Sequence, residues 1–136
     1  MQNYEAKLAH NPKELEAFLT PLVTAGIDIF HCSQRRFWEP EFEKSHLNLA
    51  GWVKKISSKP TITVGSIGLD ADFISNPDQR GFSEAEPASL NELLTRLDND
   101  EFDLIAVGRA LISNPNWVKH IPVSYTHLTL PTTQVV

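Results

Sequence analysis

The chain has 136 residues, enough for one globular domain or part of one, because domains commonly run to roughly 100–200 residues. Hydrophobic residues make up 41% and charged residues 21%, which are ordinary proportions for a globular protein. The net charge of −5 leaves no basic excess for nucleic acid or anionic lipid. We therefore expect neither nucleic acid nor a membrane among its partners.

Cysteine content and the N-terminal segment bear on the cellular compartment. Cys32 is the single cysteine, so the chain has no intramolecular disulfide and no cysteine-based zinc cluster, which agrees with a reducing compartment. The opening "MQNYEAKLAH" has neither the basic nor the apolar part of a signal peptide, and no apolar run approaches the ~20 residues of a membrane span. We expect a soluble, cytoplasmic protein.

The first predicted element is an amphipathic helix that begins after Asn11 and stops at Gly26. Asn11 is a good N-cap and Pro12 suits the first helical position. One stripe of the helix is apolar and consists of Leu15, Phe18, Leu19 and Leu22. A strand is expected next, over residues 27–32, followed by the polar and aromatic loop "QRRFWEPEFEKS".

The same helix-then-strand unit recurs twice more. "HLNLAGWVKKIS" has helical spacing and "KPTITVGSIG" contains a strand over 60–65. A long polar segment, residues 69–88, then leads into the helical "SLNELLTRLDND" and a third strand over 102–107. Three such units predict an α/β fold with parallel strands in sequence order, buried on both faces by helices. An open doubly wound sheet and a closed (β/α)₈ barrel both satisfy this pattern.

Two consecutive strands end in residues suited to phosphate. Gly65 and Ser66 follow one strand, and their small side chains let backbone N–H groups approach an anion. Gly108 and Arg109 follow the next, where the guanidinium can bind phosphate in a bidentate manner at the start of a helix. The alternative is that both glycines are turn residues and that Arg109 pairs with a carboxylate such as Asp72 or Glu101. The repetition in consecutive units favours phosphate.

Other reactive side chains have simpler interpretations. His31 and Cys32 are adjacent in a strand, so they point to opposite faces and are not expected to form a catalytic or metal-binding pair. The acidic run around Glu39, Glu41 and Glu43 is interpreted as a solvated face, and we expect no metal site there.

Three stretches of the sequence resemble the C-terminal half of the old yellow enzyme family, whose members are FMN-dependent ene-reductases on a (β/α)₈ barrel. They are "AKLAHNPKELEAFLTPLVTAGIDIFHCSQRRFWEPEF", "KPTITVGSIGL" and "FDLIAVGRALISNPNWV". The resemblance covers residues 4–121 and implies that the strands are barrel strands 6–8. It also implies that the flavin phosphate is bound by Gly65, Ser66, Gly108 and Arg109.

The loop "QRRFWEP" resembles the family segment on the substrate side of the flavin, so Phe37 and Trp38 are candidates for shaping the enone pocket. Arg35 and Arg36 lie in the same loop. They could meet a nicotinamide phosphate or an acidic substrate, or form a solvated hinge, and the two readings stay open.

The resemblance implies hydride transfer from NADH or NADPH to FMN, and then to an α,β-unsaturated small molecule. The family's substrate-gripping histidines and its tyrosine proton donor belong to earlier strands, before Met1, so no catalytic residue is assigned. The fragment alone is expected to be marginally stable and inactive. A second hypothesis is a non-redox (β/α)₈ domain that holds a phosphorylated small molecule, and a bound yellow chromophore would separate the two.

The end of the chain breaks the pattern. "VSYTHLTLPTT", from Val123, resembles a translated sequencing adapter more than a protein motif, although a genuine Thr-rich tail is the alternative. We therefore assign residues 1–122 to the barrel segment and expect residues 123–136 to pack poorly.

Overall fold

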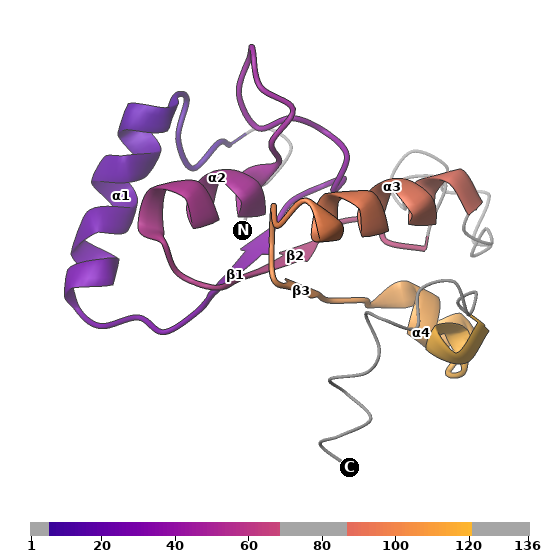
Figure 1. Cartoon of the computed structure of the whole chain (residues 1–136). Coiled ribbons are helices and arrows are strands. Elements are labelled where there is room, and N and C mark those ends of the chain that lie inside the picture. The colour runs from indigo at the N-terminus through magenta and orange to yellow at the C-terminus, as the bar shows by residue number, and fades with distance from the viewer. Residues whose placement is uncertain (1–5, 69–86, 121–136) are drawn as a thin grey trace.

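The computed structural model describes residues 6–68 and 87–120, which form a mixed α/β arrangement (Figure 1). Helices and strands alternate along the chain as the sequence predicts. The elements are α1 (Pro12–Thr24), β1 (Phe30–Ser33), α2 (Leu49–Ser57), β2 (Thr61–Val64), α3 (Pro87–Asp98), β3 (Leu104–Ile105), α4 (Arg109–Ser113) and the 3₁₀ helix η1 (Trp117–His120).

The strands form one three-stranded sheet in the order β1-β2-β3, and both pairs are parallel. Phe30 lies opposite Thr61 in the first pair, and Ile62 lies opposite Leu104 in the second. The predicted direction and order of the strands are thus confirmed. Because the strands are parallel, Gly65 and Gly108 follow their strands at the same edge of the sheet, as expected.

The strands are shorter than the apolar runs that predicted them. β3 has only two residues, although Asp103 N–H and Ala106 N–H still donate to the carbonyls of Thr61 and Thr63 at 3.0 and 2.9 Å. β1 begins at Phe30, three positions later than expected. Apolar character marks which residues are buried, whereas strand bounds depend on where a neighbouring backbone lies within hydrogen-bonding reach.

Helix α1 forms as its caps predict. The Asn11 side chain accepts a hydrogen bond from Glu14 N–H at 2.9 Å, and Pro12 occupies the first turn, where its missing N–H costs nothing. Leu15 and Leu19 are buried, but Phe18 is 44% exposed, so it does not belong to the packed stripe. α1 packs against α2 rather than against the strands, and this narrow contact covers only part of its apolar side.

One face of the sheet carries the helices. The side chains of Cys32, Thr61 and Thr63 are buried on this face, beneath α2 (Figure 1). Leu93 of α3 belongs to the same buried cluster as the α2 residues. Their sequence neighbours point to the opposite face, where Ile62 is only partly buried and Leu104 is 53% exposed. The expectation of helices on both faces is therefore wrong for the described residues. An apolar run in a strand does not reveal which of its faces a helix covers.

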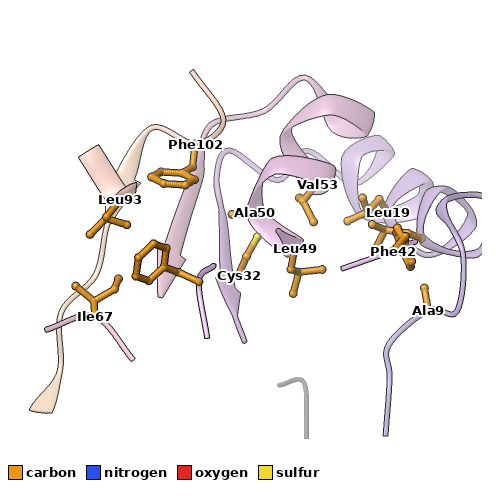
Figure 2. Packing of buried hydrophobic residues seen from close by; sticks show 12 residues of the cluster. Ala9, Leu19, Cys32, Phe42, Leu49, Ala50, Val53, Ile67, Leu93 and Phe102 are labelled. Atoms are coloured by element: carbon orange, nitrogen blue, oxygen red, sulfur yellow. The ribbon is translucent and has the colours of Figure 1, made fainter. Parts of the chain in front are cut away.

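The buried apolar cluster lies between the sheet and these helices. Figure 2 shows it extending from Phe102 and Leu93 at one end to Leu19 and Ala9 at the other, with Cys32 between them. The cluster joins α1, α2 and α3 to β1, so the core is continuous across the units. The assignment of residues 123–136 to a poorly packed tail lies outside the described residues.

Burial should make the Cys32 thiol unreactive. Loss of hydration disfavours the thiolate and raises the pKa of Cys32 to about 12. At pH 8 the thiolate fraction is then on the order of a thousandfold below that of an ordinary thiol with a pKa of about 8.5. Labelling with a thiol reagent in native buffer should be slower by at least that factor than labelling in denaturant. Equal rates in the two solutions would show that Cys32 is accessible.

Candidate functional site

The loops that follow β2 and β3 meet at one edge of the sheet. Gly68 lies in the loop after β2, and a Cβ atom added to it would lie 2.8 Å from the Ala110 Cβ and 3.3 Å from the Trp117 ring. Gly68 also has a φ of +74°, in the left-handed region that favours glycine. The two predicted phosphate-binding pairs, Gly65–Ser66 and Gly108–Arg109, therefore belong to adjoining loops.

Gly65 is explained by packing within the protein. A Cβ atom at this position would lie 2.7 Å from the Gln34 carbonyl oxygen and 3.1 Å from the Phe37 nitrogen, both of which are backbone atoms. Phe37 N–H in turn donates to the Gly65 carbonyl at 3.1 Å. The loop after β1 thus lies directly on Gly65, and the turn-residue alternative accounts for the glycine without a ligand.

Ser66 is also engaged by this loop. Its hydroxyl donates to the Arg35 carbonyl at 2.9 Å, and the residue is 8% exposed. Its φ of 52° places the backbone in the left-handed region and begins the turn toward Gly68. The Ser66 hydroxyl therefore holds the loop, and a contribution to anion binding would come from backbone N–H groups.

Gly108 differs from Gly65 because nothing within 4 Å would contact an added Cβ. It is exposed and precedes α4, a helix of five residues. The aligned peptide dipoles of so short a helix are few, so the expected contribution of a helix dipole to anion binding is small. The open space above Gly108 and the adjacent guanidinium remain as the features suited to a phosphate.

Arg109 is partly buried at the start of α4 and makes contacts within the protein. The alternative partner Glu101 lies before β3, at the opposite end of that strand from Arg109. The buried Glu101 carboxylate instead lies 3.2 Å from Nε2 of the exposed His46. This geometry argues against an Arg109–Glu101 pair, and Asp72 lies outside the described residues.

A buried asparagine joins the loop after β1 to the sheet and to α2. Asn48 is 1% exposed, and its Oδ1 caps α2 by accepting from Gly51 N–H at 2.9 Å. Its Nδ2 donates to the Phe37 carbonyl at 3.0 Å and to the Thr63 hydroxyl at 3.1 Å. One side chain therefore fixes three elements at the edge where the candidate site lies.

Gln34 reinforces this connection from the other end of the loop. Its Oε1 accepts from Leu49 N–H at 3.0 Å, and its Nε2 donates to the Arg36 carbonyl at 2.6 Å. Neither Asn48 nor Gln34 is among the residues predicted from the sequence. The N-cap preference of asparagine before an apolar helix could have identified Asn48, whereas no local pattern marks Gln34.

The two candidate substrate residues have different surroundings. Phe37 is 1% exposed and forms part of the buried cluster, so its ring offers no surface to a substrate in this structure. Trp38 is partly buried and meets the Phe37 ring edge-on at a centroid distance of 5.1 Å. The substrate role of this loop stays a prediction, and Trp38 is the residue of the two that could face a ligand.

Two charged residues of the loop pair with each other. Arg36 pairs with Glu39 at 2.8 Å, and its guanidinium lies 6.0 Å from the Trp38 ring centre. Glu41 is buried, so the interpretation of the acidic run as a solvated face is wrong at this position. The predicted opposition of His31 and Cys32 is confirmed, since His31 is exposed and Cys32 is buried.

A cleft of about 640 Å³ lies at the opposite ends of the strands, where Pro60 precedes β2 and Asp103 precedes β3. Lys54 lines it and pairs with Asp100 and Asp103. Burial alone would lower the pKa of Lys54, but hydrogen bonds and charge from these two carboxylates outweigh it and raise the pKa. The cleft is therefore lined by charges that neutralise each other. It lies opposite the glycine–arginine edge, which is the edge of the sheet that carries Gly65, Ser66, Gly108 and Arg109.

Comparisons with models of known protein families and with curated proteins found no match to this chain. Among the residues that the structure describes, no helix combines the length and apolar character needed to cross a membrane.

Replacing Asn48 should destabilise the protein more than replacing a simple helix cap. Asn48→Ala removes the α2 cap and leaves the Phe37 carbonyl and Thr63 hydroxyl without a buried donor, at a cost of about 2–4 kcal/mol. Asn11→Ala is the matched control, because Asn11 is exposed and caps α1 alone; we expect a loss of about 1 kcal/mol. Urea denaturation measures both, and equal losses would contradict the role given to Asn48.

The two strand-end glycines should respond differently to a methyl group. Gly65→Ala would force the backbone at Gln34 and Phe37 away, which should lower stability by about 1–3 kcal/mol. Gly108→Ala places its methyl group in open space and should change the free energy of unfolding by no more than an ordinary surface substitution, about 0.5 kcal/mol. Thermal or chemical denaturation of the pair tests this. A harmless Gly65→Ala would show that the loop does not rest on Gly65.

Proposed function

We propose that this chain is the flavin-phosphate-binding part of an FMN-dependent oxidoreductase that reduces activated alkenes with NADH or NADPH. The observation that carries the proposal is the meeting of the β2 and β3 loops at one edge of the parallel sheet. Gly68, two residues after Ser66, lies against Ala110, the residue after Arg109, so the Gly65–Ser66 turn and the Gly108–Arg109 pair belong to neighbouring segments of this edge. In parallel α/β proteins, ligands gather at this edge.

The chemistry of the edge suits a phosphate monoester. Gly108 leaves room for an anion to approach the backbone, and the Arg109 guanidinium can donate two parallel hydrogen bonds to phosphate oxygens. The turn that contains Ser66 and Gly68 adds backbone N–H groups in a left-handed conformation, which is a geometry found in anion-binding loops. The residues present therefore fit the phosphate end of FMN.

The coverage of the sheet supports the closed barrel over the doubly wound alternative. A doubly wound sheet has helices on both faces, whereas a (β/α)₈ barrel keeps them outside and fills its interior with strand side chains. In the described part of the chain, α2 covers one face of the sheet and Leu93 of α3 joins the buried cluster there. The other face carries Ile62, Val64 and Leu104, which are partly or highly exposed. These three apolar side chains suit the interior of a barrel that further strands would complete.

When bound, FMN would supply the hydride-transfer chemistry between the nicotinamide and the electron-poor alkene. This chain's part is to hold the phosphate with Arg109 and the backbone near Gly65, Ser66 and Gly108, and to present Trp38 on the substrate side. The proton donor and the groups that polarise the substrate carbonyl are assigned to residues outside this sequence. The same edge would also serve a non-redox barrel that holds another phosphorylated molecule.

Arg109→Ala should weaken FMN binding by the longer oxidoreductase about tenfold to a hundredfold, because charge-assisted hydrogen bonds are worth about 1.5–3 kcal/mol each. Arg109→Lys should recover only part, since an ammonium lacks the two-pronged geometry of guanidinium. Turnover of flavin-loaded enzyme should change little, because the phosphate is remote from the reacting ring. Flavin titration measures the dissociation constants.

Lys59→Ala is the matched control, because it removes one positive charge before β2, at the opposite ends of the strands. It should leave FMN affinity unchanged. If Arg109→Ala also leaves affinity unchanged, Arg109 serves a structural contact and the proposed phosphate anchor is wrong. Tight binding of other phosphorylated molecules without flavin would favour the non-redox alternative.

A further inference from the structure

Arg96 in the last turn of α3 contacts the loop after β1 at two separate points. Its Nη2 donates to the Trp38 carbonyl at 3.3 Å and its Nη1 donates to the His46 carbonyl at 3.1 Å. These contacts join residues that are far apart in sequence, and the Arg96 side chain is only 12% exposed. One guanidinium therefore holds both ends of the segment 38–46.

The Arg96 guanidinium is itself held in place by Glu92, one helical turn earlier. Glu92 Oε1 accepts from Arg96 Nε at 3.2 Å and from Nη2 at 2.8 Å. The donors that remain then point toward the loop in a fixed plane. A lysine cannot reproduce this arrangement, because its ammonium is a single point of charge on a flexible stem.

The other side of the loop rests on the candidate site. Phe37 N–H and the Arg35 carbonyl bond to Gly65 and Ser66, so the chain reaches Trp38 directly from the glycine–arginine edge. Arg36 lies over the Trp38 ring, and Arg96 binds the Trp38 carbonyl. Trp38 is thus fixed from both its ring and its backbone.

We propose that Arg96 is a positioning residue that fixes Trp38 at the substrate side of the site, through the carbonyls of Trp38 and His46. This inference rests on the proposed function, because it assumes that the edge beside Trp38 receives an alkene acceptor. Arg96 acts through the loop and touches neither cofactor nor substrate. Its removal should therefore affect acceptor binding more than flavin binding.

The first test measures amide hydrogen exchange in the full chain for wild type, Arg96→Ala, Arg96→Lys and Glu92→Gln. Exchange within 38–46 should rise about tenfold in Arg96→Ala and less in the other two, while amides of β1 and β2 serve as the internal reference. Unchanged exchange in this segment would overturn the proposal. So would wild-type exchange there as fast as in an unstructured peptide, because Arg96 would then fix nothing.

The second test measures steady-state kinetics of the longer oxidoreductase with an α,β-unsaturated ketone. Arg96→Ala should raise KM for the ketone about tenfold or more and leave the FMN dissociation constant unchanged, with partial recovery in Arg96→Lys. Equal effects on FMN binding and on KM would mean general destabilisation and would overturn the positioning role. If Arg96→Ala does not fold, Arg96→Lys and Glu92→Gln decide the same comparison.

The two tests distinguish failure of the proposed function from failure of the role proposed for Arg96. A longer protein without flavin or ketone reduction would refute the proposed function, while the exchange experiment would still decide whether Arg96 holds Trp38. An active flavoenzyme in which no Arg96 variant changes loop exchange or KM would refute only the role of Arg96.

Discussion

The arrangement of the candidate site depends on the three hydrogen bonds of the buried Asn48 side chain. They connect the N-terminus of α2, the loop after β1 and the Thr63 hydroxyl of β2. A buried amide needs partners for both its oxygen and its nitrogen, so these elements are constrained together rather than one by one. Asn48 thereby holds the loop after β1 in contact with Gly65, at the edge of the sheet where the candidate site lies.

The two strand-end glycines, Gly65 and Gly108, have different surroundings. The backbone of the loop after β1 packs directly against Gly65, whereas Gly108 faces open space. A glycine required by close packing and a glycine that leaves room for a ligand look alike in sequence, and only the neighbouring atoms separate them. The proposed phosphate anchor consequently rests mainly on Gly108 and Arg109, with Gly65 and Ser66 supporting the loop beside them.

Local signals in the sequence predicted the units of the fold well. Asn11 and Pro12 located the start of α1, and the alternation of apolar helices and strands predicted a parallel sheet in the correct order. The sequence did not reveal that Phe18 is exposed, that Glu41 is buried, or that Arg96 reaches Trp38. Each of these depends on which distant segment of the chain packs nearby. Neither hydrophobic periodicity nor secondary-structure propensity carries that information.

We propose that this edge of the sheet binds the phosphate of a flavin within a larger barrel. The most direct measurement is the visible absorption spectrum of the longer oxidoreductase that we propose contains this chain, with the cofactor released and identified by mass. We predict a yellow protein that holds one FMN per chain. A colourless protein that gains no flavin spectrum when titrated with FMN would contradict the account.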